Sequence, residues 1–457
     1  MKKVVSNALY VLFFGFAATL VIACIMLVIN VSNGEGQSVN DIEAVKLSGT
    51  VDDEIKYDSI DKEILGEGAG EYQFVPVRYG YDALDTDKKR YLYTHLAAGV
   101  YSVSNDADQN GRYRISRIKV RNHKLSEFDI REVVNAFIND NPEIFWIENL
   151  FGYAYADEDT IVEFYSVLSA DDCEKYIDRF NKKVKEILSG LEKGKTEYVR
   201  EKYIHDAVLG GCSYKTGVKT SSDGWQYFTS YGALVDGEAV CEGYAKSMQL
   251  LLSRVGINSV MIKGDAEGVA HMWNAVELNG EWYHVDPTWD DGDPEGVVSY
   301  EYFNLTTESI SKNHIICDDI ETAANAGNEN EVDPLVKYNF YVPMCTVSDM
   351  NYYYVEGVYI ETFDSKTDEL LTNAIVDRVK KGETYIPVRF GSEMPYADYM
   401  SKMFNDAPFK FYYCLENASS ELGSKYKIDM GSVSVLKNES SLTLRIRLKY
   451  ENTDARQ

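Results

Sequence analysis

Cysteine is scarce in this sequence, and none of its seven cysteines stands in a CxxC pair. Their spacing predicts neither a zinc site nor a disulfide framework, and it leaves open whether any of Cys173, Cys212, Cys317, Cys345 and Cys414 pair. The stability of the protein must therefore come from ordinary hydrophobic cores. The seven are Cys24, Cys173, Cys212, Cys241, Cys317, Cys345 and Cys414.

Clustered positive charge is also missing. The 46 Lys and Arg are outnumbered by 73 Asp and Glu, which gives a net charge of -27. This excess of negative charge argues against a nucleic-acid partner and against polybasic attachment to lipid. Hydrophobic residues make up 45% of the chain, so most of it should fold, and 457 residues without an internal repeat suggest about three units.

One long apolar run stands near the N-terminus, from Ala8 to Ile29. It is long enough to cross a bilayer as a helix. Lys2 and Lys3 precede it and acidic residues follow it, which predicts a single-pass cell-membrane protein with its bulk extracytoplasmic. The alternatives are a cleaved signal peptide or lipidation at Cys24, but the run stays apolar after Cys24 and no convincing cleavage site follows.

Periodicity and breaker residues predict an α+β protein with two folded flanks around a central segment. The predicted parts are a transmembrane anchor at 1–30, an acidic linker at 31–75, an α+β domain at 76–194, a core at 195–320, a linker at 321–335 and an α+β domain at 336–457. The predicted helices cover 84–100, 126–138, 171–192, 240–255 and 367–381, and the C-terminal strands cover 352–360, 385–390, 409–416 and 444–450.

Two acidic motifs suggest cation sites at first sight. Residues 106–111 match the opening of an EF-hand loop, but Arg117 stands where the bidentate glutamate belongs, so a turn is favoured. Asp290, Asp291 and Asp293 surround a glycine and are interpreted as a solvated acidic turn.

Cys241 falls in the first turn of the helix predicted at 240–255. The free N–H groups and the dipole of a helix N-terminus favour a thiolate there. Ala245, Met248 and Leu252 follow at helical spacing, so the sulfur should point along the buried stripe. Taken alone, Cys241 could equally be a small core residue.

Residues 271–286 predict a β-hairpin, because Asn279 and Gly280 between two β-rich runs favour a two-residue type I′ turn. In that register His271 and Asp286 share one face as diagonal neighbours, about 7–8 Å apart at the backbone. A helix bearing Cys241 on this face would complete a nucleophile, base and orienter. The same three residues match no common metal-site spacing.

His284 is the competing base, since it shares the hairpin face with Asp286. It should lie opposite Ala275, farther along the ribbon than His271, and we interpret it as structural or as lining a cleft. The other four histidines have no comparable setting, and His205 is interpreted as a packing residue.

Three blocks of this sequence resemble the transglutaminase-like superfamily, whose fold is related to that of papain-type cysteine proteases. The blocks are 237–245, 271–274 and 280–290, with weaker likeness at 203–206, 231–234 and 302–304. The resemblance spans about 195–315. It implies a papain-like core in which a helix bearing the nucleophile packs on an antiparallel sheet. The flanks resemble common companions of this core in bacterial surface proteins.

The resemblance also implies a Cys–His–Asp triad of Cys241, His271 and Asp286, with no cofactor. It further implies an oxyanion hole made by the backbone N–H of Cys241 and one upstream donor. Candidates for that donor or for the cleft are Trp225, Gln226, Tyr231, Trp273 and His284.

Together these features predict an extracytoplasmic thiol enzyme acting on peptide or side-chain amides, either a cysteine peptidase or amidase or a transglutaminase. Its partners would be the membrane and a peptide, protein or cell-wall peptide substrate. The alternative is a non-catalytic surface binding module built on the same scaffold.

Overall fold

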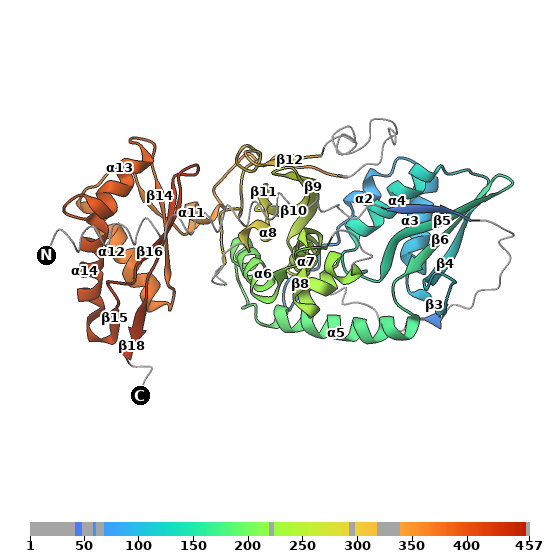
Figure 1. The fold of residues 1–457 in the computed structure, drawn as a ribbon, viewed down its shortest axis with the longest axis horizontal. Helices are drawn as coiled ribbons and strands as arrows, with labels where there is room; N and C mark the ends of the chain where they lie inside the picture. Colours follow the sequence, from blue (N-terminus) through green and yellow to red (C-terminus); the bar gives the residue numbers. More distant parts are fainter. Residues whose placement is uncertain are drawn as a thin grey trace. The chain divides into compact units, whose positions relative to one another are not determined.

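The computed structural model describes residues 42–47, 58–60, 68–218, 224–291, 298–317 and 339–453. The chain divides into two compact units, Met1–Val347 and Ser348–Gln457 (Figure 1). The apolar run predicted to span a membrane lies outside the described residues. Among the helices that are described, none is both long and apolar enough to cross a bilayer.

The first unit opens with a six-stranded sheet in the order β1-β5-β6-β4-β3-β2. Its neighbouring strands are antiparallel except for β1 and β5. The strands are β1 (Glu43–Lys46), β2 (Asp58–Ser59), β3 (Ser102–Ala107), β4 (Tyr113–Val120), β5 (Ile147–Ala156) and β6 (Asp159–Ser166).

The two edge strands of this sheet correct the prediction that 31–75 is only a linker. Strand β1 pairs with β5 and β2 pairs with β3. Ile42 and Ile60 beside them are each only 5% exposed. These strands were not predicted because the segment is acidic overall and its two buried isoleucines are isolated. Strands of two to four residues also show too little periodicity to be recognised in a sequence.

Helices α2 (Tyr79–Ala83), α3 (Asp87–Gly99) and α4 (Glu127–Asp140) accompany the sheet. The side chain of Thr86 accepts a hydrogen bond from the backbone of Lys89 at the start of α3. Ser126 and Asp129 form a capping box at the start of α4. The cap at Ser126 confirms the predicted start of the second helix, whereas α3 begins at Asp87, three residues after the predicted start at 84.

The EF-hand-like motif is a hairpin turn between β3 and β4, as predicted. The Asp108 carboxylate accepts hydrogen bonds from the backbone N–H groups of Asn110 and Arg112. Gly111 has a φ of 79°, which suits a tight turn. The acidic side chain therefore closes the turn on its own backbone.

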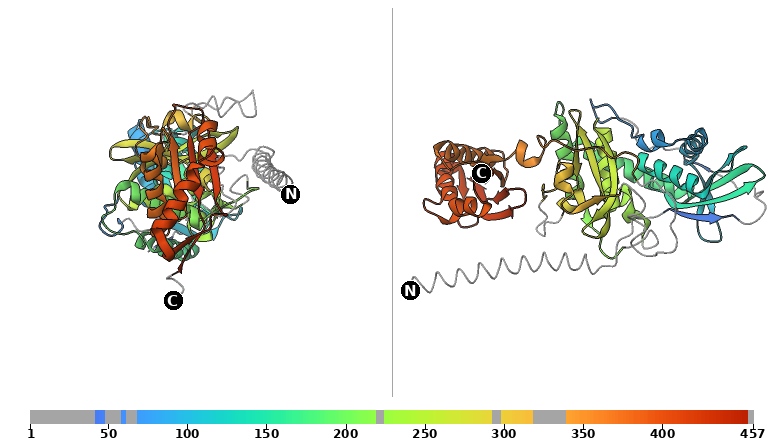
Figure 2. Two further views of the ribbon diagram at one scale, coloured as in Figure 1. Left: turned by 90° about the vertical axis from the view of Figure 1, so that its left-hand side faces the viewer. Right: turned by 90° about the horizontal axis from the view of Figure 1, so that it is seen from above.

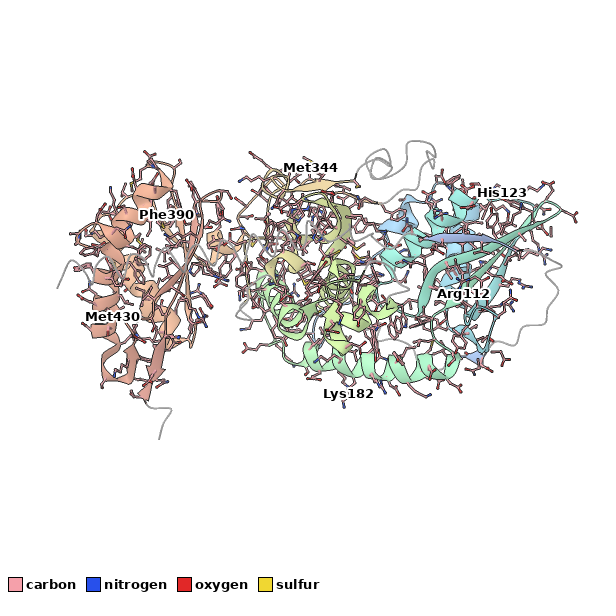
Figure 3. The ribbon with its side chains drawn as sticks, in the orientation of Figure 1. Arg112, His123, Lys182, Met344, Phe390 and Met430 are labelled. Carbon is pink, nitrogen blue, oxygen red and sulfur yellow. The ribbon has the colours of Figure 1, made fainter. Side chains whose placement is uncertain are left out.

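Helix α5 (Ala170–Ser189) is amphipathic. Its buried face carries Ile177, Phe180 and Val184, whereas Lys182 projects outward (Figure 3). The Phe180 ring lies 5.1 Å from that of Phe145, so aromatic packing fixes α5 against the segment that precedes β5.

A second sheet of the first unit has the order β11-β10-β9-β12 and is antiparallel throughout. Figure 2 shows this yellow-green sheet as a block distinct from the blue-green sheet of β3–β6. Helix α7 packs against β9 and β10 and also contacts α6 and α8. The elements are α6 (Glu197–Gly211), β7 (Ser213–Tyr214), β8 (Glu238–Ala239), α7 (Cys241–Arg254), β9 (Asn258–Ala266), β10 (Val269–Leu278), β11 (Glu281–Val285), α8 (Pro287–Asp290), α9 (Thr307–Ile310) and β12 (His314–Ile316).

The second unit is also α+β, with a sheet ordered β13-β14-β17-β16 and helices α12 and α14 packed together. Its core includes Phe390, Leu444 and Ile446. The elements are α11 (Tyr352–Val355), β13 (Val358–Ile360), α12 (Ser365–Lys380), β14 (Tyr385–Phe390), α13 (Tyr396–Met400), α14 (Lys410–Leu422), β15 (Tyr426–Ile428), β16 (Ser434–Asn438), β17 (Thr443–Arg447) and β18 (Tyr450–Asn452).

One predicted strand of this unit, at 409–416, is wrong, and the strand predicted at 352–360 is confirmed only at β13, Val358–Ile360. Residues 352–355 form α11, which Asn351 caps by accepting a hydrogen bond from the backbone of Tyr353. Residues 410–422 form α14 rather than the strand predicted at 409–416. The aromatic residues favoured a strand, but Phe411, Cys414, Leu415, Ala418 and Leu422 are buried at helical spacing. Tertiary burial thus outweighed local propensity.

Removing the Phe180 ring should destabilise the first unit. Phe180→Ala leaves a cavity beside Phe145, for which we expect a loss of about 3–5 kcal/mol in the free energy of unfolding. Lys182→Ala, on the exposed face of the same helix, should change it by less than about 0.5 kcal/mol. Urea unfolding followed by fluorescence would measure both, and equal effects would contradict the packing described.

Candidate active site

Helix α7 begins at Cys241, as predicted, and every residue of the helix is buried. Cys241 is 5% exposed and packs with Ala245, Met261 and Met272. The sulfur therefore lies on the helix face that meets β9 and β10. The six cysteines that the structure describes form no disulfide with one another.

A close backbone approach holds the segment before α7 against its first turn. The N–H of Val240 donates to the carbonyl of Tyr227 at 3.0 Å. A Cβ at Gly243 would stand 2.9 Å from that carbonyl oxygen and 2.7 Å from the Cβ of Ala239. Glycine is thus required at 243 so that the preceding segment can lie directly on the helix that carries Cys241.

The β10–β11 hairpin has the predicted register. Leu278 pairs with Glu281 across a turn in which Asn279 and Gly280 have φ values of 52° and 85°. Both values suit a type I′ turn. The same pairing places Ala275 opposite His284, so the side chains at positions 271 and 286 reach the same face.

His271 and Asp286 are in contact. Nε2 of His271 lies 2.6 Å from Oδ2 of Asp286, and both side chains are buried. The His271 ring also interacts with the side chain of Cys241. Because Nε2 is held by the carboxylate, Nδ1 is the nitrogen left for the thiol. Burial lowers the pKa of His271, but the charge and hydrogen bond of Asp286 raise it to about 10.

The Asp286 carboxylate is completely buried, yet both of its oxygens are saturated with donors. Oδ1 accepts from the backbone N–H groups of Thr288 and Trp289 at the start of α8, at 2.9 and 3.1 Å. Burial opposes ionisation, but the charge and hydrogen bond of His271 and the hydrogen bond of His314 hold the pKa of Asp286 below its usual range.

His314 is a second histidine on the same carboxylate, which the sequence analysis missed. Its Nε2 lies 2.9 Å from Oδ2 of Asp286. It comes from β12, where it pairs with Ala266 of β9. Nothing in the local sequence signals this position, because β12 joins the sheet at the edge opposite the hairpin.

Among the described residues, His271, Asp286 and His314 are the group that could hold a metal ion, with ligand atoms within 4.8 Å of one another. Zinc with bonds of about 2.0–2.1 Å to tetrahedral ligands would separate those ligands by roughly 3.3 Å. The observed 2.6 and 2.9 Å separations from Oδ2 are those of hydrogen bonds. The geometry therefore does not fit a bound metal.

The competing histidine, His284, does not face the thiol. It is fully buried, its Nδ1 accepts a hydrogen bond from Nε1 of Trp273, and its Nε2 lies 3.2 Å from Oγ1 of Thr307. Burial and the nearby His314 lower its pKa to about 4. His284 and Trp273 are thus neutral partners within the core of the sheet.

Three of the five candidates for the oxyanion donor or the cleft, those from the segment upstream of α7, lie in different surroundings. Trp225 and Tyr231 belong to an aromatic cluster with Phe145, where Tyr231 is 1% exposed. Gln226 lies in the short 3₁₀ helix Trp225–Phe228, beside the residue whose carbonyl holds Val240. An oxyanion role for any of the three stays a prediction.

A second buried cluster corrects two sequence interpretations. His205 is not only a packing residue, and Asp290 is not solvated, since both are fully buried with Nε2 of His205 3.2 Å from Oδ2 of Asp290. Nδ1 of His205 lies 3.3 Å from Asp206. Although burial lowers it, these hydrogen bonds raise the pKa of His205 to about 9. The side chain of Asp291 accepts a hydrogen bond from Tyr244 of α7.

Comparison with known protein families identifies the same part of the chain. A family model described as the transglutaminase-like superfamily matches residues 185–287, which include Cys241, His271 and Asp286. This part of the chain is a transglutaminase-like domain. It is α+β, with the cysteine-bearing helix on an antiparallel sheet, and it has the general fold of thiol acyl-transfer enzymes.

Similar solved structures are distant from this chain. A structure described as a TGase is 16% identical with a TM-score of 0.22, over 38% of this chain and 50% of its own. A candidate cysteine protease from Cytophaga hutchinsonii is 12% identical with a TM-score of 0.21, over 41% and 70%. A candidate protease from Parabacteroides distasonis is 12% identical with a TM-score of 0.19, over 30% and 35%. The chain spans half the length of the first of these, and no curated protein matched it.

The buried His205 should make the transglutaminase-like domain sensitive to alkaline pH. Its folded pKa of about 9 lies above the ordinary value of 6.5. Its stabilising effect is therefore complete below pH 6.5 and is lost as the pH rises toward 9. We expect the stability difference between wild type and His205→Gln to shrink by up to about 3 kcal/mol across this window.

Melting temperatures between pH 6 and 10 would test this expectation. His271 titrates in both proteins, so its contribution cancels in the difference. His95→Gln, at an exposed position of α3, is the control for the loss of a histidine as such. A difference between wild type and His205→Gln that does not change with pH would contradict the proposed ion pairs.

Proposed function

We propose that the transglutaminase-like domain is a thiol acyl-transfer enzyme in which Cys241 is the nucleophile, His271 the base and Asp286 the residue that orients it. The observation that carries the proposal is the 2.6 Å contact of His271 with a buried carboxylate, on a ring that also interacts with the side chain of Cys241. A metal ion is not needed for this chemistry.

The reaction begins with proton transfer from the Cys241 thiol to Nδ1 of His271. The sulfur then adds to the amide carbonyl carbon, and the negative charge moves to the carbonyl oxygen. When that tetrahedral species collapses, the carbon–nitrogen bond breaks and His271 gives its proton to the departing amine. The product is an acyl-thioester on Cys241.

The second half of the reaction consumes the thioester. Water or an amine gives a proton to His271 and attacks the acyl carbon, and the thiolate leaves and is reprotonated. Water yields a peptidase or amidase, whereas an amine yields a transglutaminase. Asp286 keeps the imidazole oriented throughout and stabilises its cationic form.

The substrate class follows from this chemistry and from the topology expected of the chain. The substrates would be peptide or side-chain amides of proteins or of cell-wall peptides. The chain would act outside the cytoplasm, anchored in the cell membrane by the apolar run of residues 8–29. The sequence supports this location through its charge asymmetry around that run.

One observation favours the second candidate, a non-catalytic surface binding module. Cys241 is 5% exposed and His271 is 6% exposed, so little of either group meets solvent. In a binding module the buried residues would serve only as scaffold. Reactivity at the sulfur separates the two candidates.

Alkylation of Cys241 as a function of pH should reveal an activated thiol. We expect iodoacetamide to modify wild-type Cys241 well below pH 8.5, the region where a free cysteine titrates. In His271→Ala the rate at pH 6 should fall at least about tenfold, because no imidazolium supports the thiolate. Peptide mass spectrometry of the full chain would measure both rates.

The other cysteine peptides serve as references within each sample, and His95→Ala is the control for loss of a histidine at an exposed site. A thiol that reacts only at alkaline pH, with equal rates in wild type and His271→Ala, would refute the enzyme and favour the binding module.

A pair of product assays would distinguish the two acyl acceptors. Incubation with a glutamine-containing peptide and a fluorescent amine should give either an amine conjugate or a free acid. Cys241→Ala should abolish whichever product forms. Product formation that persists in Cys241→Ala would exclude this sulfur as the nucleophile.

A further inference from the structure

One oxygen of Asp286 serves two histidines. Oδ2 lies 2.6 Å from Nε2 of His271 and 2.9 Å from Nε2 of His314. The other oxygen is already held by two backbone N–H groups. A Cys–His–Asp triad needs only His271 on this carboxylate, so His314 is an additional donor that the triad does not explain.

The remaining nitrogen of His314 fixes its ring. Nδ1 lies 2.8 Å from Oδ1 of Asn313, and Nδ2 of the same amide donates to the hydroxyl of Tyr302 at 2.7 Å. Both nitrogens of His314 thus face oxygen atoms, and the carboxylate oxygen of Asp286 can only accept a hydrogen bond from Nε2. The Nε2–H bond is directed at Asp286.

The surroundings of His314 exclude water. Its side chain has no exposed surface. Its ring centroid is 4.8 Å from that of Trp289, 5.1 Å from that of Trp273 and 5.5 Å from those of Tyr302 and His271. The titratable groups around it are Asp286 at the N-cap of α8, His271 of β10, Tyr302, and His284 of β11. Asp286 is the anion in this set.

We propose that His314 is a positioning residue for the triad: it donates to Oδ2 of Asp286, fixes the carboxylate against His271 and takes up part of its negative charge. The proposal rests on the function proposed above. Strand β12 would thus supply a hydrogen-bond donor to the Asp286 carboxylate, in addition to the groups that α7 and the β10–β11 hairpin bring to the site.

The physical consequence is an adjustment of the Cys241–His271 pair. Because the site contains little water, the charge of Asp286 and any hydrogen bond to it act strongly on neighbouring groups. With His314 in place, the carboxylate exerts less negative potential at the thiol. Without it, the thiolate should form at higher pH and the His271 imidazolium should persist to higher pH.

Two substitutions separate the hydrogen bond from simple packing. His314→Phe keeps an aromatic ring between Trp289 and Trp273 but donates nothing to Asp286. His314→Gln carries a neutral N–H donor at a similar distance from the backbone. The readout is the pH midpoint of iodoacetamide alkylation at Cys241 in the full chain, with the melting temperature of each variant recorded beside it.

We expect the midpoint to move upward by about one pH unit in His314→Phe, the size expected for one hydrogen bond to a charged group. In His314→Gln it should return to within a few tenths of a unit of wild type. If His314 is only structural, the melting temperature of His314→Phe falls while its midpoint stays unchanged, and that result would overturn the proposal.

A measurement on the wild-type chain covers the case in which His314→Phe does not fold. NMR of histidine-labelled protein should show a proton on Nε2 of His314 that exchanges slowly with water, because this nitrogen donates to Asp286 and its side chain is buried. A His314 ring without a proton on Nε2 would also overturn the proposal. Failure of the proposed function itself is distinct, since His271→Ala would then leave the wild-type alkylation profile unchanged.

Discussion

The arrangement of this site depends on one buried carboxylate that stays charged. Asp286 has no exposed surface, and an isolated anion there would be strongly destabilising. Four N–H groups offset that cost, two from the backbone of α8 and one each from His271 and His314. The N-terminus of α8, strand β10 and strand β12 therefore meet at a single side chain.

Much of this site could be predicted from local sequence. Two of its three residues, His271 and Asp286, lie in or directly after one hairpin. Asn279 and Gly280 determine the turn, the turn determines the register, and the register brings His271 and Asp286 to one face. The first-turn position of Cys241 followed from helical periodicity in the same way. His314 could not be found by such reasoning, since β12 reaches Asp286 only through its pairing with β9.

The errors elsewhere have a common cause, which is burial that depends on distant partners. Residues 410–422 carry aromatic side chains that favour a strand, yet the core of the second unit buries them at helical spacing. Asp290 was expected to be solvated because three acidic residues stand close together in sequence. In the fold it faces His205 of α6, 85 residues away. The acidic composition around Asp290 suggested exposure to solvent, but the contact with His205 buries its side chain.

The short helix α8 couples the two buried histidine clusters, since Asp286 stands at its N-cap and Asp290 is its last residue. Asp290 binds His205 with one oxygen and accepts the N–H of Tyr302 with the other. The carbonyl of Tyr302 in turn accepts the N–H of Asp286. These hydrogen bonds connect His205 of α6 with the backbone segment that binds Asp286, although His205 itself contacts Asp290 and Asp206. Two histidines from different elements, His205 of α6 and His271 of β10, thus contact the carboxylates at the two ends of this one-turn helix.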